Sequence, residues 1–311
     1  MQPLQRLMRR PIPNVDAVTA LRMTRPGFGV ITLTGCWLGF ALAHHSGFDV
    51  SLGPAFGVVL VALLLHAAAN VLNDYHDARS GADDANEQGI FPFTGGSRLI
   101  QNGVVTLEQT RGLAGFLLGL AVPIGLWLAW QGTWILVGLG LAGLLLGWVY
   151  SAPPVALMRR GAGEVAVGLA WALLVIGADA MFRGTLDADV AWLAAGYGAL
   201  IANILLINGF PDASADAMVG KRTAVVRLGR SRAVWLYAAL LVMSQCLLWR
   251  AMGQGVLPVA AGWALLSGLA GGDAWRLLRR HADAPQILRA AIVRTIVAAL
   301  LYGGGIALGC M

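Results

Sequence analysis

The stretch Asn70-Val-Leu-Asn-Asp-Tyr-His-Asp77 (NVLNDYHD) closes a long apolar segment and decides how the rest of the chain is interpreted. It continues as ARSGADD to Asp84, so four carboxylates, those of Asp74, Asp77, Asp83 and Asp84, follow the apolar residues in a short space. A carboxylate at membrane depth costs about 2.5–3.5 kcal/mol or more, so it usually has a partner or a function. The segment before it must therefore be examined as a membrane helix.

The composition supports that interpretation. The chain has 311 residues, of which 58% are hydrophobic and 12% charged, and its mean hydropathy is +0.70. Soluble globular proteins carry roughly 25% charged residues. The sequence therefore predicts an all-α integral membrane protein, with residues 1–311 forming a single membrane domain in the lipid bilayer. The net charge of +6 does not indicate a nucleic-acid partner, because the basic residues lie in short loops between apolar runs.

Nine apolar segments approach the roughly 20 residues that a bilayer requires. They are rich in Leu, Ala, Gly and Val and show no barrel-like alternation, so we expect helices arranged around a central cavity. Gly143 and Gly147 have a spacing that lets helices approach closely. The predicted spans are 27–45, 53–73, 112–130, 133–150, 163–182, 189–208, 232–250, 255–271 and 286–309.

The positive residues predict the orientation. With nine spans, every Lys and Arg except Arg183 and Arg250 falls on the side of the N-terminus, which the positive-inside rule makes cytoplasmic. Residues 1–26 are expected to form a cytoplasmic or interfacial segment, since the polar region before the first apolar run is too long for a usual secretory signal. The expected location is a bacterial inner membrane, with the acidic residues facing the cytoplasm.

A second acidic segment repeats the first. Asn208-Gly-Phe-Pro-Asp212 ends the sixth span and Asp216 follows, which matches the order Asn70, Asp74 and Asp77. Both groups, together with Glu87, are expected in loops after their spans, although in a helix each set would share one face. Pro211 can bend or end the second helix. Solvated helix caps would explain one cluster, but two matching copies favour a site and an internal repeat.

Two acidic clusters that face each other need cations. Carboxylate and amide oxygens without His or Cys select hard cations such as Mg²⁺, which usually completes its shell with waters and substrate phosphate oxygens. Four basic residues lie in the same loops, namely Arg79, Arg98, Lys221 and Arg222. The pattern predicts a diphosphate substrate whose lipid tail lies between helices.

These motifs resemble the UbiA superfamily of intramembrane aromatic prenyltransferases over nearly the whole chain. The matching segments are Asn73-Asp-Tyr-His-Asp77 with Asp83, Asp212-Ala-Ser-Ala-Asp216 with Gly220-Lys-Arg-Thr223 and Arg227-Leu-Gly229, and Tyr150-Ser-Ala-Pro-Pro154 with Gly163-Glu164. The spacing from Asp77 to Asp83 is most similar to the MenA branch, which prenylates 1,4-dihydroxy-2-naphthoate; the 4-hydroxybenzoate branch usually has its third Asp where this chain has Gly81. Thr94-Gly-Gly-Ser-Arg98 also looks MenA-like.

The resemblance implies a mechanism and its residues. Asp74, Asp77, Asp212 and Asp216, with Asp83, would hold Mg²⁺ on the diphosphate of a polyprenyl donor and promote its departure, and the resulting cation-like carbon would be attacked by an aromatic acceptor. Contacts to the substrates are expected from Asn70, Asn73, Asn208, Arg25, Arg98, Tyr150, Lys221 and Arg222. The chain departs from the family in having Gly27 after Arg25-Pro26, where members often carry a Lys.

Several alternatives remain open at this point. Other acceptors of the same family are 4-hydroxybenzoate, homogentisate, a chlorophyll-type ring or a haem. From other classes, a secondary transporter would place its acids within the spans, where only Asp179 comes close, and a polyprenyl-lipid binding protein would not need both acidic clusters. The roles of His66 and Asp179 and the length of the prenyl chain are not predicted.

Overall fold

A computed structural model describes residues 15–86 and 89–311, and in these ranges the chain contains helices and connecting turns but no strand. Residues 1–14 of the predicted interfacial segment, and Glu87, lie outside the described residues. The long helices are α3 (Gly29–His45), α4 (Leu52–Ser80), α6 (Leu107–Gln131), α7 (Ile135–Ser151), α8 (Gly163–Arg183), α9 (Ala188–Met218), α11 (Arg230–Gly253), α12 (Leu266–His281) and α13 (Arg289–Cys310). The shorter elements are α2 (Ala17–Met23), η1 (Pro26–Phe28), α5 (Ala82–Ala85), η2 (Leu157–Arg160), α10 (Ala224–Leu228), η3 (Val259–Leu265) and η4 (Pro285–Ile287).

Eight of the nine predicted apolar segments form α-helices over most of their length, but the count of nine membrane spans is not confirmed. Within the described ranges, seven helices are long and apolar enough to cross a membrane. Helix α7 is apolar but has only 17 residues, and α12 has 16. The predicted span 255–271 was misplaced, because its first part is the 3-10 turn η3 and α12 continues past it to His281 with Arg276, Arg279 and Arg280.

The two acidic segments are helical, which corrects the prediction of loops. Helix α4 continues seven residues past the predicted end at 73 and stops at Gly81, whose φ of 76° is the left-handed conformation that favours glycine at a helix end. Helix α9 runs through Pro211 to Met218. The apolar runs end earlier than the helices because hydropathy marks the depth of the bilayer, whereas the backbone hydrogen bonds continue through polar residues.

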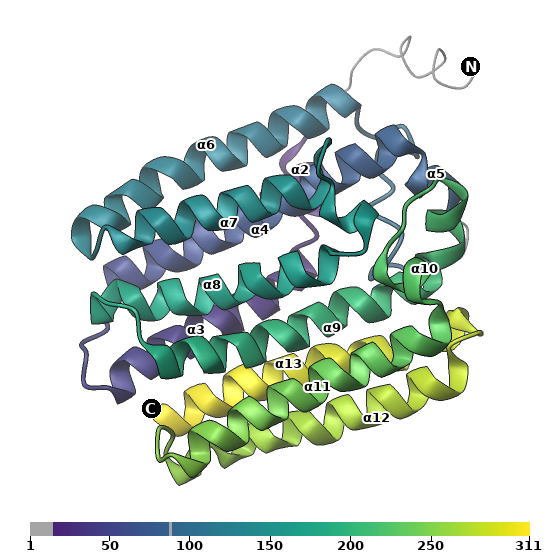
Figure 1. Cartoon of the computed structure of the whole chain (residues 1–311). Helices are drawn as coiled ribbons and strands as arrows, with labels where there is room; N and C mark the ends of the chain where they lie inside the picture. The colour runs from purple at the N-terminus through teal and green to yellow at the C-terminus, as the bar shows by residue number, and fades with distance from the viewer. Residues whose placement is uncertain (1–14, 87–88) are drawn as a thin grey trace.

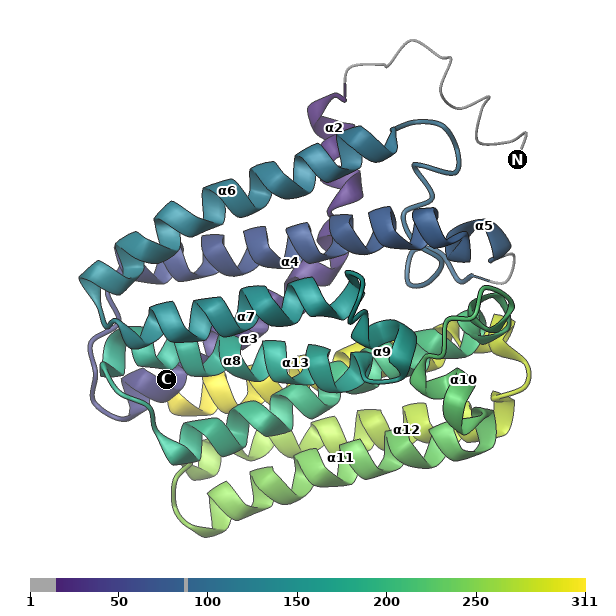
Figure 2. The same ribbon diagram turned by 45° about the horizontal axis from the view of Figure 1, so that its top comes forward.

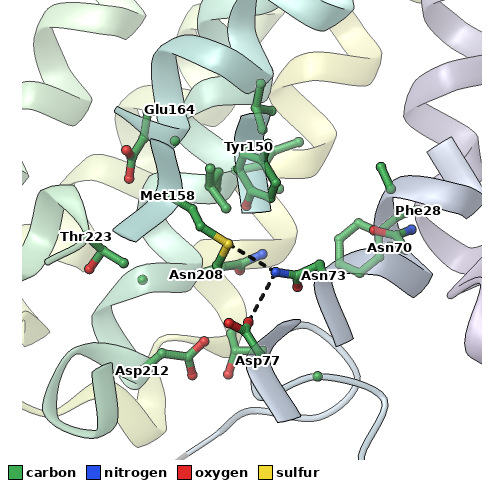
Figure 3. A pocket seen from close by; sticks show the side chains of 18 of the residues that line it. Phe28, Asn70, Asn73, Asp77, Tyr150, Met158, Glu164, Asn208, Asp212 and Thr223 are labelled. Carbon is green, nitrogen blue, oxygen red and sulfur yellow. Dashed lines mark hydrogen bonds between the residues drawn. The ribbon is translucent and has the colours of Figure 1, made fainter. Parts of the chain in front are cut away.

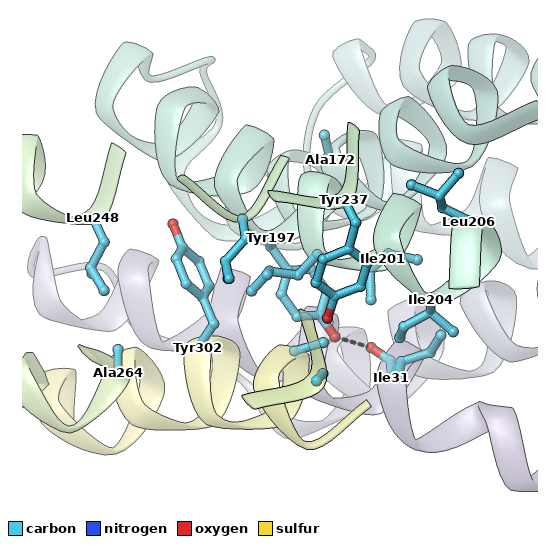
Figure 4. Close-up of a cluster of buried hydrophobic side chains, with 14 of the residues drawn as sticks. Ile31, Ala172, Tyr197, Ile201, Ile204, Leu206, Tyr237, Leu248, Ala264 and Tyr302 are labelled. Atoms are coloured by element: carbon cyan, nitrogen blue, oxygen red, sulfur yellow. Dashed lines mark hydrogen bonds between the residues drawn. The ribbon is translucent and has the colours of Figure 1, made fainter. Parts of the chain in front are cut away.

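Helix α9 is the centre of the packed core. In the most apolar stretch of α9, 78% of the residues are buried, compared with 28% in the corresponding stretches of α4 and α6. Tyr197 of α9 donates a hydrogen bond to the Ile31 carbonyl of α3 (Figure 4). Tyr302 of α13 donates to the Leu193 carbonyl of α9. A buried hydroxyl needs such a partner, so these bonds set how the three helices sit against one another.

Close helix contacts occur at glycines, but not at the predicted pair. A Cβ atom added to Gly198 of α9 would lie 2.2 Å from the Gly168 carbonyl oxygen of α8, and one added to Gly39 of α3 would lie 2.5 Å from the Val175 carbonyl oxygen. A Cβ at Gly143 or Gly147 of α7 would meet nothing within 4 Å. These two glycines therefore leave open space instead of joining helices.

The helices lie roughly side by side, and the short helices α5 and α10 are found at the same end of the bundle (Figures 1 and 2). Helix α4 packs against α6, α8 packs against α9, and α3 contacts both α8 and α13. Helix α5, which follows α4, contacts α9. The fold thus brings the polar ends of α4 and α9 together.

Candidate active site

A cavity of about 230 Å³ opens at the end of the bundle where α4 and α9 meet (Figure 3). Residues of α4, α7, α8 and α9 line it, together with the turn before α3 and the loop 93–96. Among the predicted site residues it is lined by Arg25, Asn70, Asn73, Asp77, Asp83, Tyr150, Asn208, Asp212, Asp216 and Lys221. Two acidic segments far apart in the sequence therefore share one cavity.

Helix α4 presents Asn70, Asn73 and Asp77 to the cavity. The Asn73 amide donates to Asp77 Oδ2 at 3.1 Å and also contacts the Met158 sulfur at 3.3 Å. The Asn70 amide donates to the Thr24 carbonyl at 3.0 Å, so Asn70 also holds the chain that precedes α3. The spacing of these residues places them on one helix face.

Asp74 does not line the cavity, although it was predicted as a ligand on the same face. Its carboxylate pairs with the Arg25 guanidinium and accepts the Ser97 backbone N–H at 3.2 Å. It is buried, with 4% of its surface exposed. Asp74 therefore anchors Arg25, which does line the cavity, at the start of α3.

Helix α9 presents Asn208, Asp212 and Asp216. The Asn86 amide donates to Asp212 Oδ1 at 2.7 Å, which ties the loop after α5 to α9. The Asn208 Oδ1 atom is buried and has no hydrogen-bond partner among the described residues. Figure 3 shows Asp77 and Asp212 projecting into the same space, with Asn73 and Asn208 nearby.

Lys221 links the two acidic helices. Its ammonium lies 3.1 and 3.2 Å from the two oxygens of Asp77 and 3.4 Å from Asp216 Oδ1, and only 7% of the residue is exposed. Burial would lower the pKa of Lys221, but the carboxylates of Asp77 and Asp216 outweigh burial and raise it above its usual value. One cation is thus shared by the carboxylates of α4 and α9.

Asp83 is a buried carboxyl group close to the carboxylates of Asp77 and Asp74. It is buried against Gly96, where an added Cβ would lie 2.6 Å from Asp83 Oδ2. Burial raises the pKa of Asp83 to about 8, and the carboxylates of Asp77 and Asp74 act in the same direction. The cluster therefore favours additional positive charge.

Arg98 and Arg222, both predicted as substrate contacts, do not line the cavity. Arg98 has a left-handed backbone with φ of 58° and donates to the carbonyls of Asp83 and Asn86 at 3.1 and 2.9 Å. It therefore helps to position helix α5, which carries Asp83. Arg222 is exposed, and its backbone N–H donates to the Arg159 carbonyl. The sequence does not show which basic residues of a loop face the cavity, because this depends on the path of the loop in the folded protein.

Several cavity residues were not predicted as site residues, notably Phe28, His66, Asn86, Met158, Glu164 and Trp171. His66 could have been suspected, since it precedes Asn70 and Asn73 by one and two helical turns on the same face. Its Nδ1 lies 2.8 Å from the Thr32 hydroxyl, and its ring meets Trp171 edge to face with centroids 4.9 Å apart. Trp171 lies on α8, and nothing in the sequence distinguished it from the other apolar residues of that predicted span.

The donor atoms of the cavity suit a hard divalent cation. They are carboxylate and amide oxygens, including the unpartnered Asn208 Oδ1, and the carboxyl groups of Asp77, Asp83, Asp212 and Asp216 line the same cavity. Within the described ranges, however, no three His, Cys, Asp or Glu side chains already converge as a ligand set. The residues fit Mg²⁺ in their chemistry, with substrate oxygens and water left to complete its shell.

The comparisons with known proteins agree with this chemistry. A family model of the UbiA prenyltransferase family matches residues 32–297. The 1,4-dihydroxy-2-naphthoate octaprenyltransferase of Mycobacterium leprae is 28% identical over 259 residues, which cover 80% of this chain and 83% of that protein. The chloroplastic chlorophyll synthase of Oryza sativa is 29% identical over 175 residues, 56% of this chain and 45% of that protein.

Solved structures show the same fold at low identity. A UbiA homologue from Aeropyrum pernix superposes with a TM-score of 0.72 at 16% identity and covers 92% of this chain and 98% of that one. A UbiA homologue from Archaeoglobus fulgidus, solved with DMAPP and Mg²⁺ bound, gives a TM-score of 0.55 at 15% identity over 93% and 99% of the two chains.

Proposed function

Since this chain belongs to the UbiA prenyltransferase family, we propose that it transfers a polyprenyl group from polyprenyl diphosphate to 1,4-dihydroxy-2-naphthoate in a Mg²⁺-dependent reaction of menaquinone-type biosynthesis. The chain is a prenyltransferase and an integral, multi-pass membrane protein, which leaves the transporter and the non-catalytic lipid-binding protein without support. The observation that carries the proposal is the shared cavity in which Lys221 lies between Asp77 and Asp216.

The donor diphosphate is assigned to the polar end of this cavity. Lys221 and Arg25 are the cations that line it, and both are held by carboxylates, so they are positioned before the substrate arrives. They would stabilise the negative charge that builds on the diphosphate as its bond to the allylic carbon breaks. Arg98 supports them indirectly, through its hydrogen bonds to the carbonyls of Asp83 in α5 and of Asn86 after it.

Mg²⁺ is the proposed cofactor. Asp77, Asp83, Asp212 and Asp216 would hold it in the cavity, with Asn208 Oδ1 as a further oxygen, while Asp74 contributes through Arg25. When bound, the metal neutralises the diphosphate and assists its departure as a Lewis acid. The Mg²⁺ bound in the Archaeoglobus fulgidus homologue supports this choice.

The acceptor ring is assigned to the inner part of the cavity, near Asn70, Tyr150 and Phe28. These side chains and Trp171 line the cavity and would keep water from the electron-poor allylic carbon until the ring carbon attacks it. The attacked ring carbon then loses its proton, or its carboxyl group as CO₂, which restores the aromatic ring. The preference for dihydroxynaphthoate rests on the named relatives and on the position of Asp83. A chlorophyll-type ring is the second acceptor to test, because of the similarity to chlorophyll synthase.

The proposed location is a bacterial inner membrane with the cavity facing the cytoplasm, where a water-soluble aromatic acid can enter. The arginine-rich end of the bundle supports this orientation.

The test is product formation by the purified protein in detergent with geranylgeranyl diphosphate and Mg²⁺. Dihydroxynaphthoate, 4-hydroxybenzoate and a chlorophyll-type ring are offered in parallel, with and without EDTA. We expect a prenylated naphthoate that disappears with EDTA and in Asp77→Ala. Asp84→Ala is the matched control, since Asp84 is exposed beside Asp83 and does not line the cavity.

Product from another acceptor alone would replace the naphthoate assignment. Full activity of Asp77→Ala, or full activity in EDTA, would refute the proposed site.

A further inference from the structure

A group of basic and aromatic side chains lies on the surface of α11 and α12, outside the acidic cavity. The two helices pack against each other at one edge of the bundle (Figures 1 and 2). Arg232 lies near the start of α11 and Arg279 near the end of α12, and both are exposed. Together with a tryptophan one turn from each, they form what we call the Arg–Trp cluster, which consists of Arg232, Trp235, Trp275 and Arg279. None of the four lines the acidic cavity.

Contacts along the two helices fix how they are aligned. The Gln245 amide of α11 donates to the Ser267 hydroxyl of α12 at 3.0 Å. Further along, the rings of Trp235 and Trp275 meet with their centroids 5.5 Å apart. As the residue numbers fall on α11 they rise on α12, so the helices are antiparallel. One turn beyond the tryptophans, the same alignment brings the two arginines of the cluster level with each other.

Arg279 is held by two aromatic rings instead of a carboxylate. Its guanidinium carbon lies 5.5 Å from the ring centroid of Trp235 and 5.5 Å from that of Trp275. Trp275 is fixed in turn, because its indole N–H donates to the Val234 carbonyl at 3.2 Å. A guanidinium packed on aromatic rings keeps N–H groups that can bind two oxygens of a phosphate at once. Arg279 therefore offers an oriented donor for a phosphate group.

The protein does not compensate the positive charge of the cluster. Beyond Arg230 the chain has two acidic residues, and each faces a different arginine. Asp283 Oδ1 lies 3.9 Å from Arg230 Nη1. Asp273 Oδ2 lies 2.7 Å from Arg294 Nε. Within the described part of the chain, the two arginines of the cluster form no ion pair or hydrogen bond. Two guanidinium groups at the same level repel each other, so an anion between them is favoured.

Apolar surface continues from the cluster along both helices. On α11, Val242 and Trp249 follow Trp235 by two and four turns on the same face, and the exposed fractions of these three residues are 59%, 60% and 57%. On α12, Gly272 lies one turn before Trp275, and a Cβ added to it would meet nothing within 4 Å. Helix α11 is long and apolar enough to cross a membrane. The cluster thus joins an anion-binding end to a surface that faces lipid chains.

We propose that the Arg–Trp cluster binds one anionic phospholipid, whose phosphate lies on Arg232 and Arg279 and whose acyl chains lie along the exposed face of α11. Basic groups between transmembrane helices suit anionic headgroups, and tryptophan rings favour the headgroup level of a bilayer. A soluble phosphate compound would use the arginines but leave the apolar face uncovered. This binding requires neither Mg²⁺ nor a prenyl donor, so it is independent of the proposed reaction.

A general attraction between the basic end of the bundle and an anionic membrane is the competing explanation. Arg289 separates the two explanations. It is exposed at the start of α13, close in sequence to the end of α12, and among the described residues it contacts no aromatic ring and no carboxylate. General attraction would make Arg289 as important as Arg279, whereas a site would not.

Native mass spectrometry of the full chain in detergent tests the site, with phosphatidylglycerol and phosphatidylcholine added in parallel. We expect one phosphatidylglycerol to bind with a Kd about tenfold or more below that of phosphatidylcholine. The double variant Arg232→Gln/Arg279→Gln should lose this preference, and Trp235→Leu should weaken it by about threefold, since one ring that holds Arg279 is removed. Arg289→Gln is the matched control and should keep it. An unchanged preference in the double variant, or an equal loss in the control, would overturn the proposal.

Thermal unfolding in detergent distinguishes a lipid from a free anion. Phosphatidylglycerol should raise the Tm of the wild type and of Arg289→Gln, but not that of the double variant, because a ligand of the folded state stabilises it. Without lipid, the double variant should unfold at the wild-type temperature, since both arginines are exposed. Inorganic phosphate at the same concentration should leave Tm unchanged. An equal rise with inorganic phosphate would show an ion site and refute the assignment to a lipid.

Discussion

At the scale of single residues, neighbours in the sequence have opposite environments. Lys221 is buried between two carboxylates, whereas Arg222 is exposed. Asn73 and Asp77 line the acidic cavity, whereas Asp74 lies behind Arg25. The family motif identifies all five as candidates, but their contacts divide them into residues that can touch the substrate and residues that support those.

The contrast between Lys221 and Arg222 leads to a direct prediction. Lys221→Ala should lower kcat/KM by about 100-fold or more, because it removes a cation from the diphosphate site and leaves Asp77 and Asp216 repelling each other. Arg222→Ala should change it by less than about twofold, as for most exposed substitutions. Steady-state kinetics at saturating Mg²⁺ measure both. Equal losses would show that Arg222 reaches the substrate.

At the scale of elements, helix α8 contains both Asp179, for which the sequence indicated no partner, and the arginine that pairs with it. Asp179 accepts two hydrogen bonds from Arg183, one turn later, at 2.7 and 2.8 Å, and Arg183 also donates to Ser46 in the loop after α3. Asp179 is 1% exposed. The pair ties the ends of α3 and α8 together far from the acidic cavity, so its role is structural.

Removing the cation of this pair should destabilise the protein. We expect Arg183→Gln to lower the free energy of unfolding by about 3 kcal/mol, because the Asp179 carboxylate remains buried without its partner. The double variant Asp179→Asn/Arg183→Gln should recover part of the loss. Thermal unfolding in detergent measures both, and an equal loss in the single and double variants would contradict the pairing.

The glycines of the helix contacts lead to a second prediction at this scale. Gly198→Ala should destabilise the protein by about 1–3 kcal/mol, since its Cβ would overlap the Gly168 carbonyl between α8 and α9. Gly143→Ala should have little effect, because its Cβ enters open space. The same unfolding assay compares them. Similar stabilities would mean that α8 and α9 can separate at no cost.

At the scale of the whole molecule, the fold brings α4 and α9 together at one end of the bundle and an apolar cavity into its middle (Figures 1 and 2). A prenyl diphosphate donor has a matching arrangement, with a charged head at one end and a hydrocarbon tail at the other. The basic residues of the loops fall at the end with the carboxylates, while Arg183 and Arg250 lie at the ends of α8 and α11 away from it. This asymmetry underlies the proposed orientation.

Labelling of single cysteines tests that orientation. In a Cys246→Ser background, Asp49→Cys should react with a membrane-impermeant maleimide applied to intact cells, because residue 49 is exposed in the loop between α3 and α4. Asn102→Cys, exposed in the loop between α5 and α6, should react only after the cells are opened. The reverse pattern would place the acidic cavity outside the cytoplasm.

The sequence by itself determined the membrane class, the helices and the two acidic segments, and it led to the family. These features are local: an apolar run of membrane length must form a helix, because its backbone has no other hydrogen-bond partners in lipid. Asp77 and Asp212 could be named for the same reason, since their side-chain chemistry and spacing are written along the chain.

Only the tertiary structure decided which of those candidates meet. Lys221 and Asp77 are 144 positions apart, so their contact depends on how α4 and α9 pack. The roles of Asp74 and Arg98 depend on the rotation of a helix and the path of a loop. Gly143 and Gly147 have a spacing that suits a tight helix contact, yet they line a cavity, because a neighbouring helix must also approach before that spacing can join two helices.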